Sequence, residues 1–114
     1  MPYLMIQTNL PLGKKAERAI LRNASTLVAE LLGKPESFVM VALESDTAML
    51  FAGSDDPVAF LELKSIGLAA RKTKDLSEAL CKLIEGHLGI ERDRVYVKFI
   101  DVKGSMWGWK GDTF

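Results

Sequence analysis

A pattern of strand, amphipathic helix and strand occurs twice along this chain, and it restricts the possible folds more than any other feature. Residues 3–8 (YLMIQT) are apolar and β-prone. Apolar residues then recur at helical spacing until Gly33, and they do so again between residues 76 and 88, before Gly89. Further strands are predicted in the remaining apolar runs, at residues 38–43, 48–52, 58–65 and 94–101, with the second of these runs paired to the first in a hairpin.

The two halves of the sequence superimpose after a shift of 56 positions, which lays Gly33 on Gly89. The same shift also superimposes valines in the strands that follow the two helices. We therefore predict an α+β fold in which duplicated β-α-β units, at about 2–54 and 58–110, form a single domain over 1–114. Right-handed crossovers would place both helices on one face of a mixed four-stranded sheet. The alternative is that two β-α-β units share this pattern without any duplication.

Several predicted strands are apolar on both faces. In residues 38–43 (FVMVAL) both alternating sets of side chains are apolar, and MLF and VAFL in the neighbouring strands behave similarly. Strands of this kind are normally buried on both sides, but two helices would cover only one face of the sheet. The most economical cover for the other face is a second copy of the chain, so we predict an obligate homo-oligomer.

The composition argues against several classes of partner. Lys and Arg total 15, as do Asp and Glu, so the formal net charge of +0 gives no electrostatic reason to bind nucleic acid or an anionic membrane. The sequence has neither a long uncharged apolar span nor a signal-peptide pattern at its start. We predict a soluble cytoplasmic protein, and export without a signal peptide stays open. The single cysteine, Cys81, excludes an internal disulfide, and no cluster of His, Cys, Asp and Glu indicates a metal site.

The first residues, MPYLMIQTNLP, place a proline at the start of a predicted strand. A strand tolerates proline at its first position, although proline cannot donate a ladder hydrogen bond. The second interpretation is chemical, because removal of Met1 would make the Pro2 nitrogen a free secondary amine. A base with a pKa near neutrality suits proton transfer beside a carbonyl, and an apolar pocket or a nearby cation would lower the pKa of this amine.

Six short motifs are spread in order along the whole chain. They are MPYLMIQTNLP at the start, GKP at 33–35, SIG at 65–67, DRVYV at 93–97, and GW and TF in the C-terminal tail. In this order they resemble the macrophage migration inhibitory factor family of the tautomerase superfamily. The resemblance implies a homotrimer with extra short edge strands and an active site at each subunit interface.

The resemblance also implies an enzyme, a cofactor-free keto–enol tautomerase that acts on phenylpyruvate-type and dopachrome-like compounds. Pro2 is its implied catalytic base after loss of Met1, and no metal or cofactor takes part. Lys34, in the GKP motif, matches the lysine that binds the substrate carboxylate, although a lysine just past a helix also commonly interacts with the helix C-terminus. Tyr96 matches a pocket tyrosine supplied by the adjacent subunit, and Ile66 matches a residue whose backbone meets the substrate.

The remaining candidate residues would form the walls of the pocket. Side chains that can supply an apolar wall are Tyr3, Phe38, Ile66, Trp109 and Phe114, and those that can supply positive charge are Lys34 and Lys98. Lys98 stands where mammalian members of the family have an asparagine, so it would strengthen the binding of acids, crowd the pocket or pair with an acidic residue. Trp107 replaces a valine of those members and would narrow the pocket mouth. VAFL at 58–61 replaces their Cys-x-x-Cys pair, which removes the basis for dithiol redox activity.

Two other functions compete with the tautomerase. The trimer could be a cytokine-like interaction protein that binds a protein receptor and keeps only a vestigial pocket. It could also catalyse a related reaction of the superfamily, such as dehalogenation or decarboxylation of small acids, but the extra polar or arginine groups of those branches have no convincing equivalent here. The combination of Pro2, Lys34 and the aromatic residues favours a small aromatic keto acid as the substrate.

Overall fold

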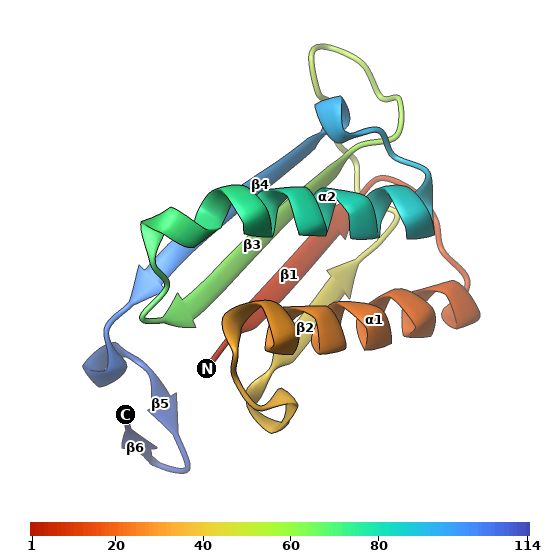
Figure 1. Cartoon of the computed structure of the whole chain (residues 1–114). Coiled ribbons are helices and arrows are strands. Elements are labelled where there is room, and N and C mark those ends of the chain that lie inside the picture. The colour runs from red at the N-terminus through yellow and green to blue at the C-terminus, as the bar shows by residue number, and fades with distance from the viewer.

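The computed structural model describes residues 1–114 and shows two layers, a four-stranded sheet and two helices packed against one of its faces (Figure 1). The elements are β1 (Tyr3–Thr8), α1 (Lys14–Leu32), β2 (Met40–Glu44), β3 (Ala59–Ile66), α2 (Thr73–Leu88), β4 (Val95–Val102), β5 (Gly108–Trp109) and β6 (Asp112–Thr113). Short 3-10 turns lie at Glu36–Phe38, Ala70–Lys72, Arg92–Arg94 and Gly104–Met106.

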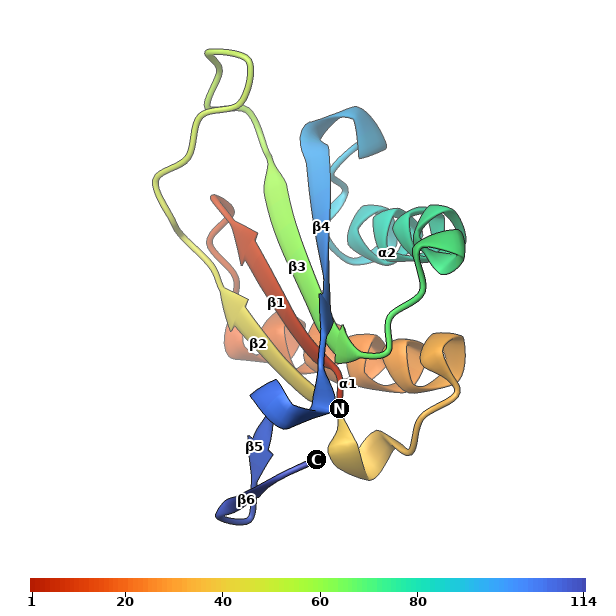
Figure 2. The same ribbon diagram turned by 90° about the vertical axis from the view of Figure 1, so that its left-hand side faces the viewer.

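The strand order in the sheet is β2-β1-β3-β4. β1 runs parallel to β2 and antiparallel to β3, and β3 runs parallel to β4. Figure 2 shows that both helices lie on the same side of this sheet. The predicted α+β fold, with a mixed sheet and both helices on one face, is therefore confirmed. Neither helix combines the length and the apolar character needed to cross a membrane.

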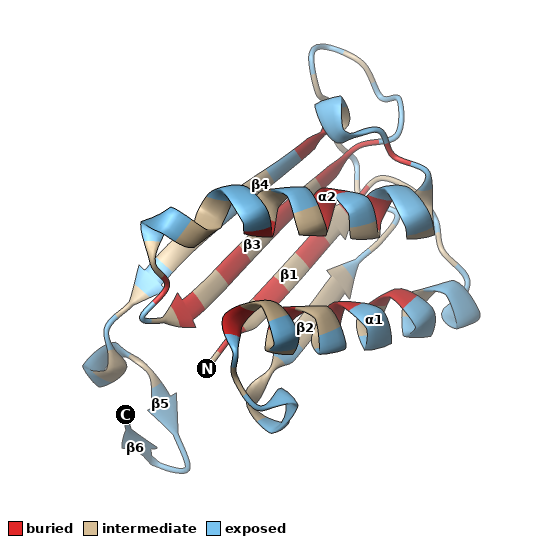
Figure 3. Cartoon of the chain, in the orientation of Figure 1, coloured by how far each residue is buried: buried red, intermediate tan, exposed pale blue.

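The hydrophobic core lies between the helices and the sheet, because every second strand residue points toward the helices. β1 buries Leu4 and Ile6 completely, and β3 buries Leu61 and Leu63 completely, while the residues between them are partly exposed (Figure 3). The helices complete the core with residues spaced three or four apart, which are Ile20, Ala24, Val28 and Leu32 in α1 and Leu76, Leu80 and Ile84 in α2.

The strand predicted at 48–52 is wrong. Only an isolated bridge between Phe51 and Ser54 occurs in this region. Ala52 and Gly53 have positive φ angles of 54° and 74°, which makes a tight two-residue turn instead of an extended strand. The apolar residues that suggested a strand are not paired within the sheet, and Leu50 is 73% exposed.

One strand boundary and one strand pairing also differ from the prediction. β2 begins at Met40 and not at residue 38, because Glu36–Phe38 form a 3-10 turn directly after Pro35. The short strands β5 and β6 pair with each other in a separate two-stranded sheet, so within one chain they do not extend the edge of the main sheet. The C-terminal hairpin instead lies beside the N-terminus, at one end of the sheet (Figure 1).

The sheet face opposite the helices is uncovered in the single chain (Figure 2). Met40 is 66% exposed and Tyr96 is 63% exposed on this side. The face is less apolar than predicted, because the alternation in β3 also brings Glu62 and Lys64 to it, where their side chains pair at 3.1 Å. That a second copy of the chain covers this face stays a prediction.

Candidate active site

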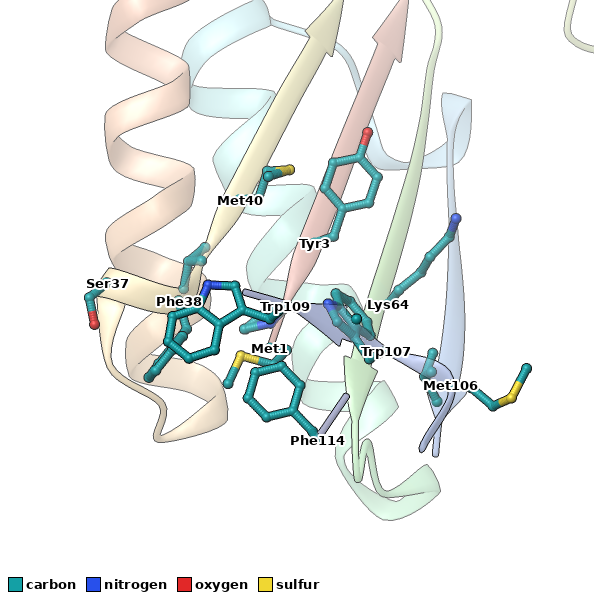
Figure 4. Close-up of a pocket in the computed structure, with 14 residues that line it drawn as sticks. Met1, Tyr3, Ser37, Phe38, Met40, Lys64, Met106, Trp107, Trp109 and Phe114 are labelled. Atoms are coloured by element: carbon teal, nitrogen blue, oxygen red, sulfur yellow. The ribbon is translucent and has the colours of Figure 1, made fainter. Parts of the chain in front are cut away.

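A predominantly apolar cavity of about 600 Å³ opens at the start of β1 (Figure 4). Of the 14 residues that line it, 10 are hydrophobic. They come from five places in the sequence: the N-terminal residues, the 3-10 turn together with the start of β2, the end of β3, the end of β4 and the C-terminal tail. The fold thus forms the cavity by bringing the two chain ends together at one end of the sheet.

Three aromatic rings form one wall of the cavity. The Phe38 ring meets the Trp109 ring edge to face, with centroids 5.3 Å apart. Trp109 in turn stacks on Phe114, with centroids 5.7 Å apart and planes inclined by only 8°. Because each ring holds the next in place, the wall is a preformed surface for a flat apolar group.

Pro2 is one of the residues that line the cavity, and it is less than 2% exposed. Its carbonyl accepts a hydrogen bond of 3.0 Å from the Met40 N–H, which fixes it at the start of the β1–β2 pairing. In this structure Met1 precedes Pro2, so the Pro2 nitrogen belongs to an amide and is not basic. The free amine is that of Met1, whose residue also lines the cavity.

The pKa of the Met1 α-amino group is lowered from its ordinary value of 8.0 to about 6. Burial is the largest cause, followed by the positive charge of Lys34 and by a hydrogen bond with the Lys34 side chain. The Met1 amine is therefore mostly neutral at pH 7.

Gly33 sets the direction of the chain toward Lys34 at the end of α1. Gly33 has a φ of 63°, a left-handed conformation that favours glycine. The Lys34 N–H donates to the Ala29 carbonyl at 3.0 Å and the Gly33 N–H donates to the Glu30 carbonyl at 3.2 Å, which closes the helix end. The chain then leaves the helix axis, and the lysine side chain reaches the end of β3.

The Lys34 ammonium is held by two acceptors at the end of β3. Its Nζ donates to the Ser65 hydroxyl oxygen at 3.1 Å and to the Ile66 carbonyl oxygen at 2.6 Å. An ammonium group carries three protons, and the third is the one that hydrogen-bonds the Met1 amine, so it becomes available to another acceptor when Met1 is removed. The site therefore combines a low-pKa amine, a fixed cation and an aromatic wall, an arrangement that can bind an aromatic acid and move a proton on it.

The sequence profile of the macrophage migration inhibitory factor family matches the chain over residues 1–114. The chain belongs to this family. A macrophage migration inhibitory factor homolog of Brugia malayi is 42% identical over 115 residues, with 100% of this chain and 99% of the homolog covered. The macrophage migration inhibitory factor of Mus musculus is 34% identical over 115 residues, with the same coverage of 100% and 99%.

Solved structures of the family superpose closely on the chain. The crystal structure of the homologue from Prochlorococcus marinus has a TM-score of 0.93 at 42% identity and covers 98% of both chains. The structure of the Trichinella spiralis protein has a TM-score of 0.90 at 33% identity, with 98% of this chain and 99% of that chain covered. The family includes both tautomerases and cytokine-like proteins, so membership alone does not decide the function of this chain.

The structure separates the predicted site residues into a group at the cavity and a group on the uncovered face of the sheet. Pro2, Phe38, Trp109 and Phe114 line one cavity. Lys34 lies beside them, as its effect on the Met1 amine and its hydrogen bond to the Ile66 carbonyl indicate.

Tyr96 and Lys98 lie on the uncovered face of β4, and neither lines the cavity of its own chain. In the pairing of β3 with β4, Tyr96 stands opposite Phe60 and Lys98 stands opposite Glu62. Both residues therefore lie on the open face of the sheet, and neither is in place to act within the cavity of its own chain.

Lys64 is a lining residue that the sequence analysis missed. Its Nζ lies 5.8 Å from the centre of the Tyr3 ring and 3.1 Å from the Glu62 carboxylate, which leaves its aliphatic stem along the cavity edge. Tyr3 and Lys64 are directly paired across the antiparallel β1–β3 ladder. The position of Lys64 at the cavity therefore follows from the strand register, which the hydrophobic pattern alone does not define. Met106 and Trp107, from the C-terminal tail, also line the cavity.

Proposed function

We propose that this chain is a cofactor-free keto–enol tautomerase that uses Pro2 as its base and acts on phenylpyruvate-type and dopachrome-like compounds. One observation carries the proposal: the start of β1, where burial and Lys34 lower the pKa of the Met1 amine to about 6, opens into an aromatic-walled cavity. Membership of a family that includes tautomerases supports this proposal.

The chemistry begins with removal of Met1, which turns the Pro2 nitrogen into a secondary amine. Pro2 is buried at the same end of β1. We therefore expect burial and the Lys34 charge, which lower the pKa of the Met1 amine, to lower the pKa of the Pro2 amine as well. The neutral amine takes a proton from the carbon beside the substrate carbonyl, and the protonated amine then gives that proton to the carbonyl oxygen as the enol forms. The same steps run in reverse convert the enol to the ketone, so the reaction needs neither an oxidant nor a cofactor.

Two contacts bind the proposed substrate, one with Lys34 and one with the aromatic wall. The carboxylate of a keto acid accepts a hydrogen bond from the remaining donor of Lys34, and the opposite charges strengthen this contact. The aromatic ring of the substrate packs on the wall made by Phe38, Trp109 and Phe114. These two contacts place the reacting carbon next to Pro2, so the proposed substrate is a small aromatic keto acid.

Proteins of this family form homotrimers, and we propose the same assembly for this chain. A trimer would cover the open face of the sheet, where Met40 and Tyr96 are 66% and 63% exposed. It would also place Tyr96 and Lys98 of one subunit at the cavity of its neighbour, where the phenol can donate a hydrogen bond to a substrate oxygen.

The proposal is tested by following phenylpyruvate between its enol and keto forms by absorbance, with Met1 removal verified by intact mass. We expect Met1-free protein to accelerate the reaction far beyond buffer without an added cofactor, and light scattering to give three times the chain mass of 12.6 kDa. A Met1-free trimer with no acceleration would contradict the tautomerase and favour the cytokine-like alternative. A stable monomer would contradict the shared site.

A further inference from the structure

Arg94 binds the exposed loop that joins residue 51 to β3 (Figure 1). Its Nε donates to the Pro57 carbonyl at 2.9 Å, and its Nη1 donates to the Phe51 carbonyl at 3.1 Å. Its Nη2 donates to the carbonyls of Ser54 at 3.2 Å and Asp56 at 3.0 Å. One planar guanidinium thus fixes four carbonyl groups, a geometry that a lysine ammonium cannot reproduce.

The same guanidinium holds the Phe51 side chain. Its central carbon lies 5.3 Å from the centre of the Phe51 ring, within the range of a cation–π contact. The Phe51 ring also meets the Tyr96 ring edge to face, with centroids 4.8 Å apart and an interplanar angle of 64°. Arg94, Phe51 and Tyr96 therefore form one continuous stack at the start of β4.

Tyr96 depends on this stack for its orientation. Its side chain stands on the uncovered face of the sheet, and the residue is 63% exposed. Phe51, in turn, precedes a tight turn at Ala52 and Gly53 and has only the bridge to Ser54 as local backbone support. Arg94 thus mainly sets the position of the Phe51 ring. The Phe51 ring in turn sets the orientation of the Tyr96 phenol.

We propose that Arg94 and Phe51 are positioning residues that fix the Tyr96 phenol for substrate binding in the cavity of the neighbouring subunit. This inference rests on the proposed function, in which Tyr96 completes that cavity. A phenol already held in one rotamer loses less conformational entropy when it binds substrate than a freely rotating one does. The stack therefore acts on the reaction through Tyr96 and makes no contact with substrate itself.

The chain offers a matched control for loop stability. Asn9 also holds the loop, since its side-chain amide donates to the carbonyls of Asp55 at 2.9 Å and Asp56 at 3.2 Å and its Oδ1 accepts from the Val58 N–H at 3.0 Å. Its side chain makes no hydrogen bond to Phe51. Asn9→Ala therefore loosens the loop without removing the stack, whereas Phe51→Leu removes the ring and leaves the Arg94 hydrogen bonds.

The first test observes Tyr96 directly by NMR, with labelled tyrosine rings in a chain that has only two tyrosines. Tyr96→Phe assigns the signals. We expect Phe51→Leu and Arg94→Lys to shift the Tyr96 ring signals toward those of a free tyrosine, and Asn9→Ala to leave them in place. Unchanged Tyr96 signals in Phe51→Leu would overturn the inference, whether or not the protein is an enzyme.

The second test is a double-mutant cycle on phenylpyruvate turnover. Phe51→Leu is expected to lower kcat/KM by about two- to tenfold, and to have almost no further effect when Tyr96→Phe is already present. Additive losses, or an equal loss in Asn9→Ala, would overturn the positioning role. An inactive wild-type trimer would instead overturn the proposed function, so the two failures are distinguishable.

Discussion

Phenylpyruvate tautomerisation is expected to fall by about 10²- to 10⁴-fold when one glycine remains in front of Pro2, because the only proposed base then becomes an amide. The variant carries Met1→Gly and is released from a cleavable fusion, so that glycine stays attached. It keeps every residue from Pro2 to Phe114, and therefore the Lys34 contacts and the aromatic wall. The measurement is kcat/KM for this chain and for the Met1-free chain, with both masses verified.

Two controls make this comparison specific. Met1-free Pro2→Gly keeps a free amine at the same place without the proline ring, so its activity should lie between those of the Met1-free and glycine-extended chains. Lys82→Met changes an exposed side chain that pairs with Glu78 on α2, far along the sequence from the cavity residues, and it should match the wild type. A glycine-extended chain that is as active as the Met1-free chain would show that Pro2 is not the base.

Lys34→Met is expected to lower kcat/KM for phenylpyruvate by about 10- to 100-fold, the effect of losing a charged hydrogen bond to the substrate. An uncharged ester of the same acid should lose much less, because it has no carboxylate for Lys34 to bind. Lys64→Met is the matched control, since Lys64 lines the same cavity but is paired with Glu62. Equal losses for the acid and its ester, or for the two lysine variants, would contradict the assigned role.

The same variant has a predicted effect on pH dependence. The positive charge of Lys34 disfavours the protonated form of the Met1 amine and is one cause of the lowered pKa of that group. By the same effect, Lys34→Met should raise the pKa of the Pro2 amine. The acid limb of kcat/KM should therefore move to higher pH. The ester is the substrate of choice, because its binding does not depend on Lys34. An acid limb that stays in place or moves to lower pH would contradict this electrostatic coupling.

Local signals predicted the framework of the fold. The bounds of β1 match the apolar run at 3–8, and both helices end at Gly33 and Gly89, which have φ angles of 63° and 67°. These elements were predictable because periodic apolar residues and glycine stops act over a few neighbouring positions. The run at 48–52 carried the same local signal without a sheet partner, and the structure has a turn there instead.

Residue contacts that depend on strand register and loop geometry could not be predicted from the sequence. Lys64 lies at the cavity because β1 and β3 pair in one particular register. Arg94 reaches the Phe51 carbonyl across 43 positions of sequence, which no local pattern indicates. Pro2, Lys34 and the aromatic residues were found from the family motifs, and the structure adds which of them share a cavity within one chain.

The central claim is that the Pro2 nitrogen is a neutral base at physiological pH. Its most direct test is an NMR titration of Met1-free protein labelled with ¹⁵N-proline, in which only the Pro2 nitrogen is an amine among the four prolines. We expect a pKa well below that of an ordinary secondary amine, coinciding with the acid limb of kcat/KM. A Pro2 amine that is still protonated where kcat/KM has reached its plateau would contradict the account.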